Sequence, residues 1–386
     1  MKIHFILNCF WPNGTAMSGG DKRFVEFFKI WQNDDRFGFK LYTTKGFSEI
    51  LKREGITNIP IELIEKNSIK GNSNIIINYL KRTINCILLK KNICNGDVVY
   101  STTDIMPDVI PGFFLKRKYK NNIKWVVIVH HIVESYRTRP GNKLVNYISE
   151  KQQRFSLWLT KKYADKVLIE SPLVYDWMKQ KRWNMDKIQW TSNGVDVELL
   201  EPVVPSEQKY DACFLGRLNN SKGIMELPHI WKKVVKELPN AKLGIIGSGT
   251  SEMTEKLKNE IFKCKMEDNI DMLGFVETLE TYAIMKASKV FLFTSHEEGW
   301  GIAIAEAMAC GLPVVAYNLP VYKHIFKSGI IECSFKNIDE MAENTIALLK
   351  NESRAIEIGG SGEMYVKQNY QWKSVAEKEL NLLVSW

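Results

Sequence analysis

The sequence predicts an α/β protein of two doubly wound domains that face each other, each a parallel sheet covered by helices. Its length is the first indication, because 386 residues exceed what one hydrophobic core usually supports. The second is a rhythm of short β-rich apolar runs alternating with amphipathic stretches, which is typical of repeated strand-helix units. Because the rhythm occurs twice, we expect one domain over residues 1–200 and another over residues 201–370.

Apolar runs in each half are expected to form the strands. Between the halves lie a turn at residues 193–196 and a proline-punctuated connector at residues 201–206, which mark the boundary. Residues 371–386 carry apolar side chains at helical spacing and predict a closing helix that packs back on the first domain. The expected strands are KIHFIL, FKLYTT, DVVYST, KWVVIVH and KVLIES in the first half and YDACFLG, AKLGIIG, NIDMLGF, KVFLFTS and LPVVAY in the second.

Cysteine usage and charge indicate the compartment and the partners. The 7 cysteines are scattered without CxxC spacing, which argues against a disulfide framework or a zinc knuckle and favours a reducing cytosol. No apolar run approaches the roughly 20 residues that span a bilayer. Residues 1–200 hold 32 Lys and Arg against 19 Asp and Glu, a net +13, whereas residues 201–386 hold 21 against 25, a net −4.

The basic excess of the first half falls partly in segments that mix cations with large apolar residues, at 74–92, 113–125 and 154–166. Such segments can lay apolar side chains into a headgroup region while Lys and Arg meet lipid phosphates. The alternative is that each is an ordinary amphipathic helix packed on its own sheet. We expect a cytoplasmic protein, peripheral on the inner face of the membrane, with no nucleic-acid partner.

In the second half, GRLNNSKG places Gly216-Arg217 at the end of a strand and Lys222-Gly223 at the expected opening of a helix. Ligands of open α/β sheets bind beyond the carboxyl ends of strands, where helix N–H groups add positive charge. Two cations at such a loop make a diphosphate site. The alternative is a surface loop with two ordinary basic residues. The next strand ends at Gly247, where a ligand or a neighbouring backbone can come close.

The stretch SHEEGWGIAIAEAMACGLPVVA begins at Ser295 and sets two carboxylates before a run of small residues. Glu298 is expected in the loop after a buried strand and Glu306 within the first turns of the next helix. Carboxylates at this place suit sugar and ribose, because each accepts two hydroxyl hydrogen bonds at once. Gly299 and Gly301 leave backbone N–H groups free for a phosphate. Acids near a helix start also serve simply to favour the helix dipole.

Two features of the first half lie at corresponding strand ends. Gly19-Gly20 follows the first predicted strand and precedes an amphipathic helix, so a ligand can approach the backbone there; the pair is alternatively a flexible connector. His130-His131 ends a buried strand on its carboxyl edge. A lone histidine is more often structural than catalytic, but this edge is where ligands bind.

Together these segments resemble the retaining glycosyltransferases of family 4, which have the GT-B architecture of two facing Rossmann-like domains. The resemblance covers nearly the whole chain. Its most specific part is EGWGIAIAEAMACGLPVVA, where seven residues separate two glutamates, as in the family's paired-glutamate motif. Trp300 departs from the pattern, because Phe is commoner there. The other segments that carry the resemblance are the glycine pair, the strand-end histidine, SNGVD, GRLNNSKG and IIGSG.

The resemblance implies transfer of a hexose from a UDP- or GDP-sugar to an acceptor hydroxyl, with retained anomeric configuration and without a metal or other cofactor. The implied catalytic residues are His130, Arg217, Lys222 and Glu298. The implied acceptor-binding residues are Gly19, Gly20 and His131, and we favour His130 over His131 as the sugar-contacting histidine. The implied donor-binding residues are Gly20, Arg217, Lys222, Gly247, Glu298, Gly299, Trp300, Gly301, Ile302 and Glu306.

The expected acceptor is a lipid-linked or membrane-associated glycan, and a soluble acceptor is the alternative. Two other functions fit the same architecture. A nucleotide-sugar epimerase would bind the same donor, but the spacing of GRLNNSKG and EGWGIAIAE speaks against it. A catalytically silent binding protein would have no need to keep Arg217, Lys222, Glu298 and Glu306.

Overall fold

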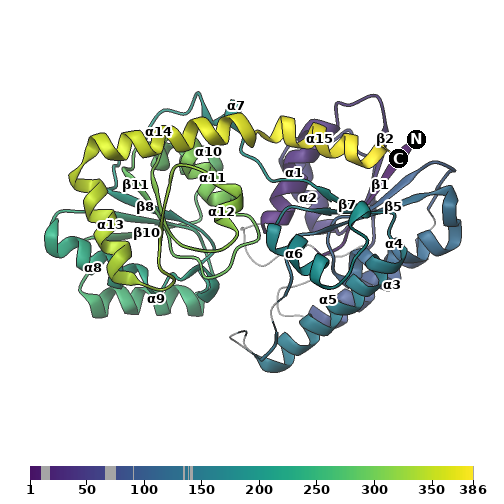
Figure 1. Cartoon of the computed structure of the whole chain (residues 1–386), viewed down its shortest axis with the longest axis horizontal. Coiled ribbons are helices and arrows are strands. Elements are labelled where there is room, and N and C mark those ends of the chain that lie inside the picture. The colour runs from purple at the N-terminus through teal and green to yellow at the C-terminus, as the bar shows by residue number, and fades with distance from the viewer. Residues whose placement is uncertain are drawn as a thin grey trace. The chain divides into compact units, whose positions relative to one another are not determined.

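The computed structural model describes residues 1–9, 18–65, 75–89, 91–133, 135–137, 139 and 142–385. The chain forms two compact units (Figure 1). The first unit holds the described residues up to Ser192 together with those from Lys373 onward, and the second holds Asn193–Trp372. The structure therefore divides the chain at the start of the turn at residues 193–196, slightly before the predicted position at residue 200. Among the described residues, no helix is long and apolar enough to cross a membrane.

The first unit is built on a seven-stranded sheet whose neighbours pair in parallel, in the order β3-β2-β1-β4-β5-β6-β7. The five predicted strands are present, whereas the short edge strands β3 and β7 were not predicted. The strands are β1 (Lys2–Leu7), β2 (Gly38–Thr43), β3 (Ile61–Leu63), β4 (Val98–Ser101), β5 (Lys124–Val129), β6 (Lys166–Ile169) and β7 (Ile188–Trp190).

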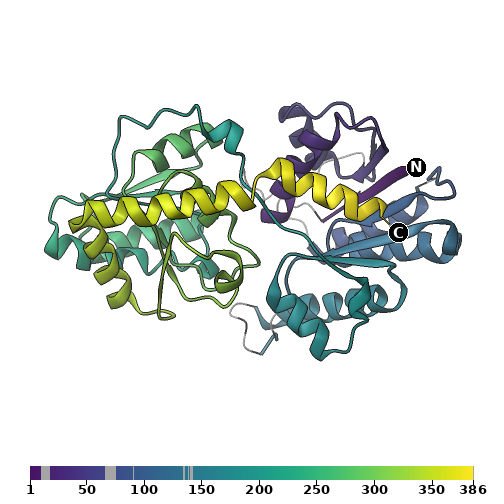
Figure 2. The same ribbon diagram turned by 45° about the horizontal axis from the view of Figure 1, so that its top comes forward.

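Helices α3, α4 and α5 form one layer of the first unit, because α4 packs on both of its neighbours and on β1, β4 and β5. On α1, the Trp31 indole donates to the Ala376 carbonyl of α15 at 3.1 Å. Figure 2 shows α15 in yellow alongside this unit. The helices are α1 (Gly19–Trp31), α2 (Lys45–Arg53), α3 (Ile75–Leu88), α4 (Met106–Tyr119), α5 (Lys143–Tyr163), α6 (Pro172–Gln180) and α15 (Trp372–Val384).

The second unit is built on a six-stranded parallel sheet in the order β10-β9-β8-β11-β12-β13. The five predicted strands are present, and the edge strand β13 was not predicted. Strand β11 ends at Phe293, two residues before the predicted end at Ser295. The strands are β8 (Ala212–Leu215), β9 (Leu243–Ile246), β10 (Ile270–Gly274), β11 (Val290–Phe293), β12 (Val314–Tyr317) and β13 (Ile330–Cys333).

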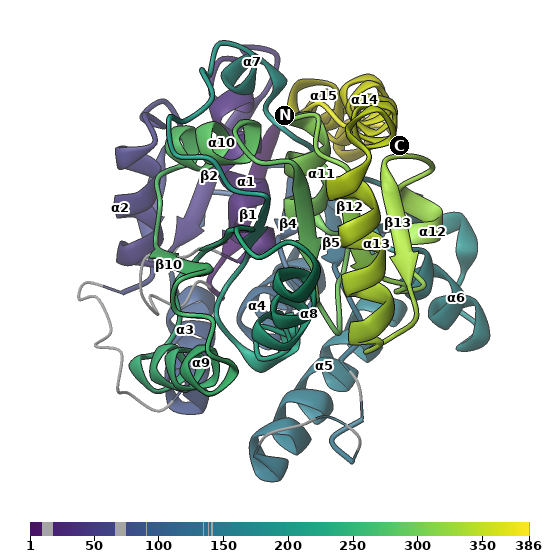
Figure 3. The same ribbon diagram turned by 90° about the vertical axis from the view of Figure 1, so that its left-hand side faces the viewer.

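The helices of the second unit form two layers, one on each face of its sheet (Figure 3). One layer contains α8, α9 and α13, and the other contains α7, α10, α11 and α14. The short α12 follows β12. The helices are α7 (Val197–Leu200), α8 (Leu227–Glu237), α9 (Ser251–Cys264), α10 (Thr278–Lys286), α11 (Ile302–Ala309), α12 (Tyr322–Ile325), α13 (Ile338–Lys350) and α14 (Glu352–Asn369).

Both sheets reverse their strand order once, and the reversal positions the candidate site. In the first unit β1 lies between β2 and β4, and in the second β8 lies between β9 and β11. At such a switch point the loops after the two central strands diverge to opposite faces and leave an opening at the carboxyl edge. The loops after β8 and β11 carry GRLNNSKG and SHEEGWG. Sequence segments far apart in the chain are thus brought to one edge.

Candidate active site

The loop after β8 is held against the end of β11. Lys222 closes a 3₁₀ turn, Asn220–Lys222, in which the Asn219 side chain accepts from the Lys222 backbone at 3.1 Å. Gly223 follows in the left-handed region with φ +62°, and a Cβ there would lie 2.0 Å from the Thr294 carbonyl oxygen. The Thr294 hydroxyl donates to the Lys222 carbonyl at 2.9 Å. This loop geometry requires glycine at residue 223.

The expectation that Lys222 opens a helix is wrong. Helix α8 begins only at Leu227, with Pro228 in its first turn. The left-handed Gly223 interrupts a continuous helix, and Pro228 suits a helix start because its missing N–H is not needed there. Lys222 therefore projects from a loop fixed by hydrogen bonds rather than from a helix N-terminus.

Lys222 and Glu298 form an ion pair that joins the loops after β8 and β11. Their side chains are 17% and 11% exposed, so the pair is sheltered but open at one side. The backbones also connect, because the His296 N–H donates to the Ser221 carbonyl at 2.8 Å. The sequence assigned Lys222 to a diphosphate and Glu298 to a sugar, and the structure brings these two side chains into contact.

Arg217 is exposed, and within the described residues no hydrogen bond or ion pair engages its guanidinium. It follows β8 directly, at the same edge as Lys222. A guanidinium at this edge has its planar fork of donors available for a phosphate.

Gly247 is required by a neighbouring backbone. Its φ is +140°, and a Cβ at this position would lie 1.8 Å from the carbonyl oxygen of Gly216. The loops after β8 and β9 are therefore in direct contact, so a neighbouring backbone does come close to Gly247. A donor role for Gly247 remains a prediction.

We expect Gly247→Ala to lower the free energy of unfolding by more than about 2 kcal/mol, because the backbone is strained for an L-residue and the Gly216 carbonyl blocks the methyl group. Gly360→Ala is the matched control. Gly360 lies in α14 with no atom within 4 Å of an added Cβ, so this change should stabilise by about 0.5–1 kcal/mol. Urea unfolding of both variants measures the difference, and equal stabilities would contradict the loop contact.

Trp300 is a core residue of the second unit. Its side chain is 3% exposed and meets the rings of Phe326 and Tyr370 at centroid distances of 5.5 and 5.0 Å. Only its backbone is therefore placed to meet a donor. Gly301, with φ +106°, precedes α11 and supplies no capping side chain, so the N–H groups of Ile302 and the following residues have no side-chain cap.

Glu306 lies within the first turns of α11, as predicted, but it is nearly buried. Its carboxylate is 3% exposed and accepts from the Tyr282 hydroxyl of α10 at 3.1 Å. The hydrogen bond holds one carboxylate oxygen in place. The ribose role of Glu306 remains a prediction.

A second polar cluster at this edge was not predicted. His296 contacts Glu226 at 2.8 Å, and the Tyr317 hydroxyl donates to the other oxygen of the same carboxylate. Burial opposes ionisation of Glu226, but the hydrogen bonds from His296 and Tyr317 outweigh it and lower the pKa of Glu226. The one feature of the sequence that could have indicated this cluster is that His296 directly follows Ser295, the predicted end of the strand.

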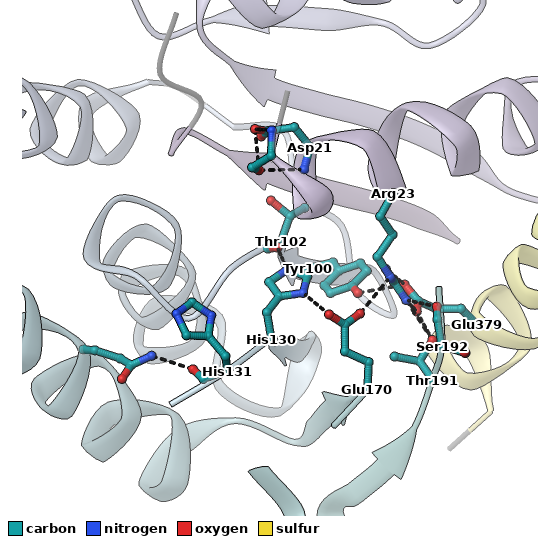
Figure 4. A network of polar contacts seen from close by, with 12 residues as sticks. Asp21, Arg23, Tyr100, Thr102, His130, His131, Glu170, Thr191, Ser192 and Glu379 are labelled. Atoms are coloured by element: carbon teal, nitrogen blue, oxygen red, sulfur yellow. Dashed lines mark hydrogen bonds and ion pairs between the residues drawn. The ribbon is translucent and has the colours of Figure 1, made fainter. Parts of the chain in front are cut away.

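In the first unit the structure distinguishes the two histidines (Figure 4). The His130 ring nitrogens lie 3.0 Å from Glu170 Oε1 and 3.1 Å from the Thr102 carbonyl oxygen. His131 is exposed, and its backbone carbonyl accepts from the Gln153 amide at 2.8 Å. A Cβ on Gly20 would lie 3.4 Å from His130 Nε2, so the glycine pair that opens α1 lies directly over the His130 ring.

One group of potential metal ligands occurs within the described residues. His229, Glu260 and Cys264 lie within 4.8 Å of one another on α8 and α9. However, Glu260 faces His229 Nε2 and Cys264 faces His229 Nδ1, so a single ion cannot use both contacts of the ring. The group includes none of the predicted site residues.

The comparison with protein families identifies the second unit. Residues 198–364 match the model described as Glycosyl transferases group 1. The match covers less than half of the chain and lies within the second unit. The match spans Arg217, Lys222, Gly247, Glu298 and Glu306, and it confirms the resemblance found in the sequence.

Two bacterial proteins are similar to stretches of this chain. The poly(glycerol-phosphate) alpha-glucosyltransferase of Bacillus subtilis (strain 168) is 34% identical over 156 residues, which are 39% of this chain and 22% of that protein. The poly(ribitol-phosphate) alpha-N-acetylglucosaminyltransferase of Staphylococcus aureus (strain COL) is 25% identical over 353 residues, 89% of this chain and 66% of that protein. The chain thus spans less than two thirds of either relative.

Solved structures confirm the fold. The crystal structure of Anabaena Alr3699/HepE in complex with UDP and glucose matches with a TM-score of 0.75 at 18% identity, covering 100% of both chains. The chain therefore has the predicted GT-B class of two Rossmann-like parallel-sheet units.

Proposed function

We propose that this chain transfers a hexose from a nucleoside-diphosphate sugar to an acceptor hydroxyl with retention of anomeric configuration. The observation that carries the proposal is the Lys222–Glu298 pair beside the free guanidinium of Arg217, at the switch point of a unit that matches the group 1 model. Cations for a leaving diphosphate and a carboxylate for sugar hydroxyls are what this chemistry needs.

The proposed division of roles follows the geometry. Arg217 and Lys222 stabilise the negative charge that develops on the departing diphosphate, which removes the need for a divalent metal ion. Glu298 accepts hydrogen bonds from the donor sugar while it holds Lys222 in place. Glu306 accepts from the ribose, and the N–H groups at the start of α11 meet a phosphate. No other cofactor takes part in this proposal.

The donor is tested with purified protein and a panel of UDP-, GDP- and ADP-sugars, each with and without EDTA. We expect one donor to raise the melting temperature and to be hydrolysed slowly, with equal rates in EDTA. Loss of activity in EDTA that magnesium or manganese restores would contradict the metal-free proposal. Conversion of the sugar to an epimer without its release would favour the epimerase instead.

The proposed acceptor is lipid-linked or membrane-associated, and helices α3 and α5 of the first unit carry this proposal. Exposed apolar side chains follow one face of α3 at Ile77, Leu80, Ile84 and Leu88. On α5, Phe155 and Trp158 are 48% and 53% exposed. Residues 74 and 90 of the predicted segment lie outside the described residues.

Cations accompany these apolar side chains. Lys162 lies 5.6 Å from the centroid of the exposed Trp158 ring, one turn further along α5. Lys116, in the predicted basic segment of α4, is instead 12% exposed and bonded to Asp165, so it belongs to the fold. A helix that exposes apolar side chains beside Lys, as α5 does at Phe155, Trp158 and Lys162, suits an anionic lipid surface.

Trp158→Ser combined with Lys162→Glu should weaken binding to anionic liposomes at low salt by tenfold or more, because each cation contributes about 1 kcal/mol and the indole is lost as well. Binding of the unchanged protein should fade as salt rises. Sedimentation with anionic and neutral liposomes measures both effects. Phe262→Ser combined with Lys258→Glu is the control, since these residues are 69% and 57% exposed on α9 at the same spacing.

A soluble anionic acceptor is the second candidate. Two relatives are named for transfer to poly(glycerol-phosphate) and poly(ribitol-phosphate), and the net charge of +13 over residues 1–200 would attract such polymers as well. No preference for anionic liposomes, or equal binding by the α5 variant, would favour this acceptor.

A further inference from the structure

A buried array of alternating charges runs from α15 to His130 within the first unit (Figure 4). It contains Glu379, Arg23, Glu170 and His130, in that order. The side chains of Arg23 and Glu379 are 0% exposed, and that of Glu170 is 6% exposed. Two acids and two bases in contact balance each other, which is the condition under which charges are tolerated in a protein interior.

The two ring nitrogens of His130 both face acceptors. Nδ1 lies 3.0 Å from the Glu170 carboxylate and Nε2 lies 3.1 Å from the Thr102 carbonyl oxygen. A neutral imidazole carries one N–H, so one of its nitrogens would turn a lone pair toward an oxygen lone pair. Only the imidazolium donates to both oxygens.

Arg23 fixes the far side of Glu170. Its Nε lies 3.4 Å from Glu170 Oε2, while Glu170 Oε1 faces His130. The rest of the guanidinium is held by Glu379, by the Thr191 hydroxyl at 2.8 Å and by the Ser192 carbonyl at 3.3 Å. The Tyr100 hydroxyl donates to Glu379 at 2.7 Å. Arg23 is thus anchored at several points, and Glu170 is clamped between two cations.

The charged groups that face His130 come from three elements. Glu170 follows β6 and Asp104 follows β4, and both favour the imidazolium, whereas Arg23 of α1 opposes it. Burial alone would lower the pKa of His130, but the Glu170 charge and hydrogen bond outweigh burial and raise the pKa above the usual 6.5. The charged form therefore persists above pH 6.5.

We propose that Glu170, Arg23 and Glu379 are positioning residues that keep His130 doubly protonated beneath Gly20, so that this histidine serves as a fixed hydrogen-bond donor and not as a proton acceptor. In the proposed transfer reaction, a doubly protonated His130 has no lone pair to accept the proton of the acceptor hydroxyl. Only this effect on turnover rests on the proposed function. The charge of His130 instead lies under the backbone at the start of α1.

The test is a pH titration of the histidine rings of the full chain by NMR, with His130 assigned from the signal that His130→Gln removes. We expect the His130 midpoint above pH 6.5, with protons on both ring nitrogens below it. Glu170→Gln should lower the midpoint by about 1 to 3 pH units, the effect of losing a neighbouring opposite charge. Glu170→Asp keeps the negative charge, so its His130 midpoint should lie between those of Glu170→Gln and the unchanged chain.

Glu379→Gln tests the distant end of the array. The glutamine oxygen still accepts hydrogen bonds from Tyr100 and Arg23, but the negative charge that offsets Arg23 is lost. Arg23 then neutralises the charge of Glu170 more fully, so the titration midpoint of His130 should fall. Glu377→Gln is the control, because Glu377 is exposed on the same helix and should cause no shift. Unchanged signals of His4, which is buried in the same unit against Tyr42 and Asp97, show that the variants remain folded.

A wild-type midpoint at or below 6.5, a single ring proton below the midpoint, or an unchanged midpoint in both Glu170→Gln and Glu379→Gln would overturn the proposal. None of these measurements needs a substrate. Absence of sugar transfer with the expected titration would refute the proposed function alone. In an active enzyme, the alkaline limb of the pH–rate profile should move to lower pH in Glu170→Gln.

Discussion

We expect Arg217→Ala and Lys222→Ala each to lose about 10²-fold or more in turnover, while their unfolding free energies stay close to that of the unchanged chain. The expected loss is that of removing one group that stabilises transition-state charge. Arg217 is exposed and Lys222 projects from a loop that backbone hydrogen bonds hold, so neither side chain carries the fold. Turnover with the best donor of the panel and urea unfolding measure the two quantities.

Two further variants sharpen this prediction. Lys350→Ala removes a cation that pairs with Glu237 at 3.0 Å on the helix ends α13 and α8, and it should leave turnover unchanged. The double variant Lys222→Ala with Glu298→Gln separates two effects of Lys222→Ala: the loss of the cation, and the unpaired Glu298 carboxylate that it leaves behind. If the double variant recovers activity, the unpaired Glu298 caused the loss. Near-normal turnover in both single variants would refute the diphosphate site.

Glu298→Gln and Glu306→Gln should differ in what they weaken. Loss of charge at a hydrogen-bonded carboxylate costs about 1.5–3 kcal/mol, or roughly 10- to 100-fold in binding. Glu298→Gln should weaken use of the donor but leave binding of the free nucleoside diphosphate nearly intact. Glu306→Gln should weaken both, because the ribose is common to donor and product. Calorimetry with the nucleotide alone and kinetics with the donor measure the contrast.

Tyr282→Phe is the control for Glu306, since it removes the hydroxyl that donates to this carboxylate and leaves the carboxylate charged. It should affect nucleotide binding less than Glu306→Gln. If both glutamine variants bind free nucleotide as the unchanged chain does, Glu306 does not bind ribose.

The sequence by itself determined the fold class and the edge at which the candidate site lies. Buried strands of a parallel sheet are continuous apolar runs, so ten strands were readable, nine of them central and one, β10, at an edge. The residues that follow them were placed at the carboxyl edge. The edge strands β3, β7 and β13 escaped, because each is short and its apolar run is interrupted by a polar residue, at Glu62, Gln189 and Glu332. The start of α8 was misplaced because the left-handed geometry of Gly223 is set by its contact with Thr294.

Only the tertiary structure decided which side chains meet. Sequence pattern assigned Lys222 and Glu298 separate roles, but adjacent strands β8 and β11 bring them into one ion pair. It favoured His130 over His131 only through the resemblance, whereas packing holds the first between two acceptors and exposes the second. Arg23 and Glu379 are 356 residues apart. The local sequence pattern indicates whether a segment is a helix or a strand. Which side chains contact each other across such separations depends on the order of the strands and the packing of the helices. These are established only in the folded chain.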